Sequence, residues 1–175
     1  MEAAAAAAGR MRRLFPVLLV LFASAAVAQD ATAAGDLAGR FTRAFQSGDI
    51  SGARYTVVDT AIIVATGPGT AFVELDLNFF NGHQCSIAGM ATLENGRLVH
   101  RDAEMPDHEG APCELSLWRE GGRLRWTDGE GSCRAFCGAR GSMTDGEMRW
   151  SSRRAIPRAE QSRILREYEA VRNLP

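Results

Sequence analysis

Apolar and polar residues alternate along most of the chain beyond residue 50. In residues 71–79, AFVELDLNF, apolar side chains take every second position, and acidic or amide side chains take most of the positions between them. This period of two is typical of a strand with one buried face. The sequence has nine strand candidates, at residues 39–45, 53–65, 71–79, 85–93, 97–101, 113–118, 123–127, 133–137 and 147–151.

Turn residues separate these segments at intervals of about ten residues. Asn95-Gly96 is a strong two-residue hairpin signal, and Gly121-Gly122 joins a second pair of segments. We therefore expect an all-β fold, a small antiparallel barrel or sandwich of eight to nine strands. Strands do not alternate with helical segments, as a doubly wound fold would require.

The spacing of apolar residues changes near the end of the chain. Ile164, Leu165, Tyr168 and Val171 recur at helical spacing, and Pro157 suits the first position of a helix. We predict a β-domain over residues 29–156, with residues 157–175 forming one C-terminal amphipathic helix packed on the outside or at one end of that domain.

Residues 1–28 have the pattern of a cleaved signal peptide. Two arginines at positions 12 and 13 precede a short apolar run, and Ala26-Val27-Ala28 supplies the small residues that signal peptidase accepts. Met11 is an alternative start. The apolar run is shorter than the roughly 20 residues of a membrane span. The sequence predicts a periplasmic or secreted bacterial protein that begins near Gln29 and has no membrane span.

The net charge argues against two classes of partner. The chain has 20 basic residues, all arginine, and 21 acidic residues; removing residues 1–28 leaves a net charge near −3. This balance does not favour nucleic acid or an anionic membrane. The remaining 147 residues suit one domain.

Four cysteines remain after cleavage: Cys85, Cys113, Cys133 and Cys137. An even number in a small exported chain predicts two structural disulfides, with three possible pairings. Metal binding would need free thiolates, which an oxidising compartment disfavours. The CRAFC spacing also has one residue more than a thioredoxin-like motif.

Candidate catalytic groups are sparse. His83, His100 and His108 show no dense ligand spacing, and Ser142 lies outside any nucleophile elbow. No phosphate-binding loop is present either. We expect no catalytic residue, no metal and no cofactor.

The charged residues are unevenly distributed along the chain. Residues 102–114 contain five acids and no arginine, whereas residues 134–166 contain eight arginines and three acids. Opposed charges of this kind suit docking to charged partners, although ordinary solvated strand faces are the simpler interpretation. The candidate partner-binding residues are Arg134, Arg140, Asp107, His108, Glu109 and Trp118.

Residues 71–150 resemble the β-domain of secreted bacterial proteins grouped with LprI-type lysozyme inhibitors. The similarity is carried by the Asn-Gly-His-x-Cys motif at 81–85, by a small-residue strand around Gly89, by Cys113, and by Cys137-Gly138. The cysteine-bearing helical segment that often accompanies this family is not visible here. The resemblance implies a disulfide-bearing secreted β-domain and suggests a lysozyme or another envelope protein as partner.

For the disulfides, our working hypothesis is Cys85–Cys113 with Cys133–Cys137. Four residues of straight strand span about 13 Å, whereas bridged Cα atoms lie within about 7 Å. A disulfide between Cys133 and Cys137 therefore requires a turn at residues 134–136. If that stretch is straight, Cys133 and Cys137 pair separately with the other two cysteines.

Three functions fit the sequence to different degrees. The first is an exported non-enzymatic binding domain, in which an arginine loop at residues 134–140 blocks a lysozyme cleft or the acidic segment docks on a cationic surface. The second is a lipocalin-like carrier of a small molecule. The third is an uncharacterised hydrolase that uses His83 or His108.

Overall fold

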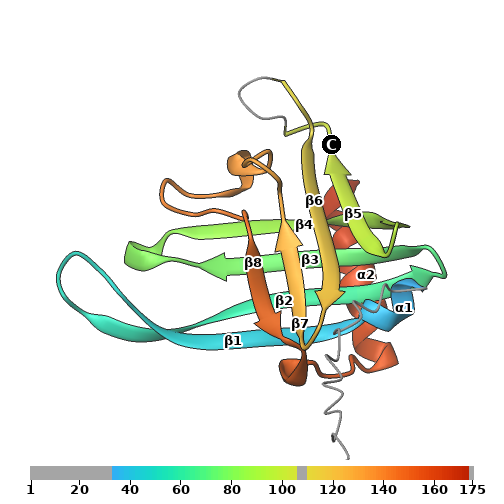
Figure 1. Cartoon of the computed structure of the whole chain (residues 1–175), viewed down its shortest axis with the longest axis horizontal. Helices are drawn as coiled ribbons and strands as arrows, with labels where there is room; N and C mark the ends of the chain where they lie inside the picture. Colours follow the sequence, from blue (N-terminus) through green and yellow to red (C-terminus); the bar gives the residue numbers. More distant parts are fainter. Residues whose placement is uncertain (1–32, 106–109, 174–175) are drawn as a thin grey trace, which may run out of the picture.

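The computed structural model describes residues 33–105 and 110–173, and within them the chain forms an antiparallel β-meander (Figure 1). Eight strands lie side by side in sequence order and curl into a nearly closed barrel. The strands are β1 (Gly39–Gly48), β2 (Arg54–Gly67), β3 (Thr70–Asn78), β4 (Gln84–Glu94), β5 (Arg97–Asp102), β6 (Cys113–Glu120), β7 (Arg123–Thr127) and β8 (Gly146–Arg149). The helices are α1 (Ala34–Leu37) and α2 (Arg158–Arg172), with 3-10 turns η1 (Phe80–Gly82), η2 (Arg134–Phe136) and η3 (Trp150–Ser152).

The predicted all-β fold is confirmed, and both hairpin signals stand at the tips of hairpins. One predicted strand is wrong: residues 133–137 contain η2, because their two cysteines are bonded to different strands. The last strand ends at Arg149 and continues into η3. The C-terminal helix is confirmed, with Pro157 at the capping position and Arg158 as its first residue.

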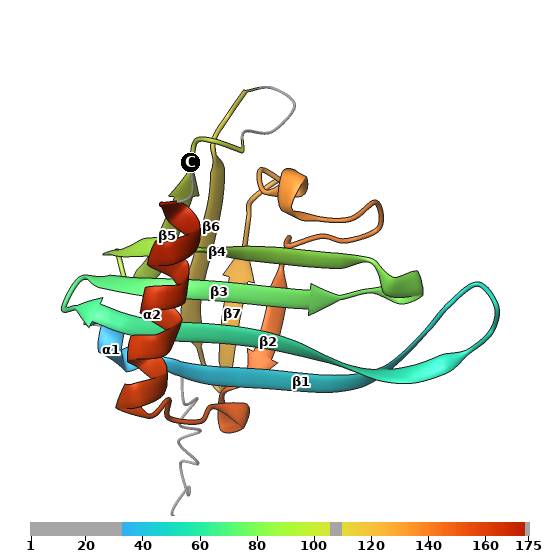
Figure 2. The same ribbon diagram turned by 180° about the vertical axis from the view of Figure 1, so that it is seen from behind.

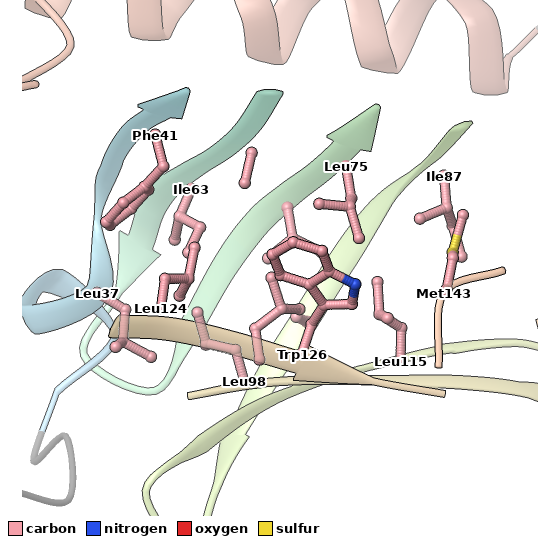
Figure 3. Close-up of a cluster of buried hydrophobic side chains, with 14 of the residues drawn as sticks. Leu37, Phe41, Ile63, Leu75, Ile87, Leu98, Leu115, Leu124, Trp126 and Met143 are labelled. Atoms are coloured by element: carbon pink, nitrogen blue, oxygen red, sulfur yellow. The ribbon is translucent and has the colours of Figure 1, made fainter. Parts of the chain in front are cut away.

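The barrel is flattened into two layers that cross. Strands β1 to β4 lie along one axis and alternate in direction, and β5 to β8 cross them in front (Figure 1). Between the layers, fully buried side chains point toward one another, among them Phe41, Leu75, Leu115 and Trp126 (Figure 3). These side chains fill the barrel interior.

Helix α2 lies on the outside, across the back of β1 to β4 (Figure 2). Ile164 is its one buried residue, and it belongs to a second apolar cluster with Ile62, Val64 and Phe72. The ring of Tyr168 packs against Phe72 with 5.0 Å between centroids. The apolar outer face of β2 and β3 is thereby covered. None of the helices in the described part of the chain is long and apolar enough to span a membrane.

Candidate functional site

Both disulfides act on one segment, residues 128–145, which connects β7 to β8. The bonds join Cys85 to Cys137 and Cys113 to Cys133. Our working pairing is therefore wrong, although the turn that it required is present as η2. Cys133 is buried beside the first residue of β6, whereas Cys137 pairs with Cys85 as an isolated bridge on β4. The turn directs the two neighbouring cysteines to different strands.

A buried carboxylate organises the start of this segment. Asp128 is only 3% exposed, and its Oδ2 accepts a hydrogen bond from the backbone N–H of Cys133 at 3.3 Å. Its Oδ1 accepts the hydroxyl of Thr144 at 2.7 Å. One side chain thus ties together the two ends of this 18-residue connection.

We call residues 137–142 the Arg140 loop. The side chain of Arg134 holds the backbone of this loop. Its Nη2 donates to the carbonyl of Ala139 at 2.6 Å, and its Nη1 donates to the carbonyls of Gly138 and Gly141. The guanidinium has five N–H donors in a fixed planar fork, and here it reaches three carbonyls at once. The guanidinium of Arg134 is therefore bound to the backbone of the Arg140 loop.

The base of the Arg140 loop is fixed to β4. The N–H of Gly138 donates to the carbonyl of Gln84 at 2.7 Å, next to the disulfide at Cys85. Gly141 is buried against that disulfide, and a Cβ atom there would lie 2.5 Å from the Sγ of Cys85. The N–H of Gly141 also donates to the carbonyl of Gly138 at 2.9 Å, which closes a tight turn.

Arg140 is exposed in this turn. Among the described residues it makes no ion pair or hydrogen bond with its side chain. A free guanidinium on a backbone fixed by a disulfide and three carbonyl contacts can donate a bidentate pair of hydrogen bonds to a carboxylate.

Of the other predicted binding residues, Trp118 lies in the described part of the chain, and it does not join this loop. Trp118 is half-buried on the outer face of β6, where the guanidinium of Arg97 stacks 4.0 Å from its ring centroid. It lies five residues along β6 from Cys113, about 16 Å at the rise of a strand. Asp107, His108 and Glu109 lie outside the described residues. Of the predicted binding residues, the structure thus brings together Arg134, which holds the loop backbone, and Arg140, whose side chain is exposed.

An ion-pair network lies near Trp118 on the outer surface. Arg101 contacts Glu94 at 2.5 Å and Glu114 at 2.9 Å. The hydrogen bond from Arg101 holds the pKa of the Glu94 carboxyl below its usual value. The charge of Arg101, on β5, is therefore neutralised by carboxylates on the neighbouring strands β4 and β6.

The histidines in the described ranges are separated. His83 lies beside Gly138, and His100 is buried, with its Nδ1 2.9 Å from the carbonyl oxygen of Met90. The hydroxyl of Ser142 accepts the N–H of Thr144. Within the described residues, no group of three or more His, Cys, Asp or Glu is placed to hold a metal ion.

Asp128 is the site residue that the sequence did not reveal. Its Thr-Asp-Gly context is that of an ordinary turn, and only its burial between Cys133 and Thr144 shows its structural role. Comparison of the chain with protein-family models, with curated proteins and with solved structures gives no match.

Proposed function

We propose that this protein is an exported, non-enzymatic binding domain whose Arg140 contacts carboxylates of a partner, and that a lysozyme or another envelope protein is that partner. The single observation that carries the proposal is the Arg140 loop. An exposed arginine stands on a backbone held by Arg134 and by the Cys85–Cys137 disulfide.

The rigidity of the loop favours binding. Ordering a flexible loop on association costs free energy, and a loop already fixed avoids that cost. A lysozyme cleft contains a pair of acid–base carboxylates. A guanidinium placed between them would neutralise the groups that the enzyme needs for catalysis.

Two sequence observations agree with this proposal. The signal-peptide pattern of residues 1–28 and the disulfides are consistent with an oxidising, exported location. The resemblance to LprI-type proteins includes Cys85 and Cys137, the two cysteines that hold the loop.

The two alternatives have less support. A carrier needs an internal cavity, whereas side chains such as Trp126 and Leu115 fill the interior here (Figure 3). A hydrolase needs a positioned base and acid, and His83 forms no ion pair within the described ranges.

Inhibition of C-, G- and I-type lysozymes by the chain from Gln29 tests the proposal. We expect at least one type to be slowed at micromolar concentration. Arg140→Ala should weaken that inhibition at least about thirtyfold, the lower end of the usual loss when one partner of a buried charged contact is removed. Arg166→Ala, which removes an exposed arginine from α2, is the matched control and should change nothing.

If no lysozyme is slowed, a pull-down from envelope extract compares the wild-type chain with Arg140→Ala. A protein retained by the first and lost with the second identifies another envelope partner. Equal retention by both chains, or none by either, would overturn the role of Arg140.

The role of Arg134 has its own test. Arg134→Ala should leave both disulfides in place but free the loop backbone, so that trypsin cleaves after Arg140 faster than in the wild type. Unchanged cleavage would mean that the disulfide alone fixes the loop.

A further inference from the structure

The barrel is not closed between β1 and β8, and this seam exposes backbone groups. Arg40 and Arg154 exchange backbone hydrogen bonds of 2.9 and 2.8 Å at one end of the seam. Further along, the link is a side chain: Nη1 of Arg43 donates to the carbonyl of Glu147 at 3.3 Å. Beyond that point β1 continues to Gly48 with no strand beside its outer edge (Figures 1 and 2).

The geometry of β1 identifies the open groups. Alternate residues of a strand direct their N–H and C=O groups to the same side. Arg40 faces the seam, and the N–H of Thr42 donates there to Ser152 Oγ. Ala44 and Gln46 therefore also face the seam, and their backbone groups bind no other described residue. Both residues are exposed.

A positively charged cleft of about 590 Å³ adjoins this edge. Its charged lining residues are Arg43, Arg123, Arg149 and Glu147. Arg123 pairs with Glu147 at 2.7 Å, and Arg43 pairs with the buried Asp59 at 2.6 Å. Arg149 is exposed and makes no ion pair in the described part of the chain. The cleft thus has a surplus of positive charge beside unpaired strand edges.

We infer that the β1 edge binds an extended acidic peptide segment of a partner protein by strand addition. The segment runs antiparallel to β1, the geometry with the more stable ladder. Its backbone pairs with Ala44 and Gln46, and the acidic side chains of its C-terminal half reach Arg149 in the cleft. Main-chain pairing supplies affinity in such complexes, and side-chain contacts supply specificity.

This surface is separate from the Arg140 loop, so the two proposals fail independently. The seam lies along β1 and β8, whereas the loop is fixed to β4 at Cys85. Arg140→Ala should leave peptide binding unchanged.

Fluorescence anisotropy with a labelled peptide tests the inference. The acidic probe is the C-terminally amidated peptide Thr-Val-Thr-Val-Glu-Val-Glu-Val, whose amide removes any contribution from a terminal carboxylate. A second probe replaces its two glutamates by lysine. Two further probes keep the acidic sequence but carry N-methyl groups on one or the other set of alternate amides, so that only one of the two cannot donate to the β1 edge.

We expect saturable binding of the acidic probe and no binding of the lysine probe. One of the two N-methyl probes should bind at least about fivefold more weakly than the acidic probe, since the loss of one hydrogen bond corresponds to about fivefold in affinity. Arg149→Glu should abolish binding, whereas Arg166→Ala should not affect it. Ala44→Pro should also weaken binding, because it removes an N–H group of the open edge and leaves the ladder to β2 intact.

Three results would overturn the inference. They are no saturable binding of the acidic probe at low salt, equal binding of both N-methyl probes and the acidic probe, and a wild-type dimer in sedimentation that Ala44→Pro dissociates. The last result would mean that the edge pairs with a second copy of the chain.

Discussion

At the scale of single residues, two glycines inside the barrel make room for large rings. The Cβ of an alanine at position 89 would lie 2.1 Å from Cε1 of His100, and at position 146 it would lie 2.0 Å from the ring of Trp126. The His100 ring lies where β4 and β5 diverge, since their pairing ends at Ala91 and His100. At this point the Nδ1 of His100 lies 2.9 Å from the carbonyl oxygen of Met90. Neither glycine has a positive φ. The space that the two rings occupy, and not the backbone conformation, therefore explains why glycine stands at both positions.

Gly89→Ala should destabilise the protein by about 1–3 kcal/mol, the usual cost of overpacking a core. Urea denaturation measures the loss. In the His100→Ala background the same substitution should cost less than about 1 kcal/mol, because the clashing ring is gone. Gly122→Ala is the control, since nothing lies within 4 Å of its new Cβ. Equal costs in both backgrounds would show that another neighbour resists the methyl group.

Glu74 gives a prediction about pH. Burial raises the pKa of its carboxyl above the ordinary 4.5, and repulsion from Asp76 adds to the shift. The folded state then binds the proton more tightly than the unfolded state, so stability falls as the pH rises from about 4.5 through the folded pKa. Glu74→Gln should therefore stabilise the protein at pH 7, by less than about 1 kcal/mol because water still reaches the side chain.

Melting temperatures at pH 4 and pH 7 test this prediction. The gain from Glu74→Gln should be present at pH 7 and absent at pH 4. Glu130→Gln, at an exposed position, should show no such difference. An equal gain at both pH values would mean that packing, and not charge, is responsible.

At the scale of elements, eight strands and one helix follow from the sequence because their periods reflect one-sided burial. In β4, for example, buried and exposed residues alternate from Gln84 to Thr92. The segment from Asp128 to Thr144 could not be predicted, because its shape depends on contacts with distant strands. Cys137 bonds to a residue 52 positions away, and no local pattern of residues encodes that distance. Arg140 was a candidate from charge alone, but only the structure separates its role from that of Arg134.

Helix α2 provides a test at this scale. Ile164 is 7% exposed beneath the helix, whereas Val171 is 68% exposed. Ile164→Ala should cost roughly 2–3 kcal/mol, within the usual range for a buried isoleucine. Val171→Ala should change stability by less than about 0.5 kcal/mol. Similar effects of the two substitutions, measured by denaturant titration, would contradict the packing of α2 on β2 and β3.

At the scale of the whole molecule, the disulfide pairing determines how the loop and the barrel are connected, and trypsin can test it. Arg134 lies between Cys133 and Cys137, so cleavage after arginine separates them. Mass spectrometry of the unreduced digest should find residues 55–97 bonded to 135–140, and residues 102–119 bonded to 126–134. A fragment joining 55–97 to 102–119 would contradict the structure.

The two disulfides should also differ in what they stabilise. Their cysteines are 52 and 20 positions apart, and the entropy of loop closure gives roughly 4 and 3 kcal/mol for these lengths. Replacing Cys85 and Cys137 by alanine should thus lower stability more than replacing Cys113 and Cys133. It should also weaken binding through Arg140, because it releases the base of the loop from β4, while the peptide affinity of the β1 edge stays unchanged. Loss of both activities together would mean that the loop and the seam depend on each other through the barrel.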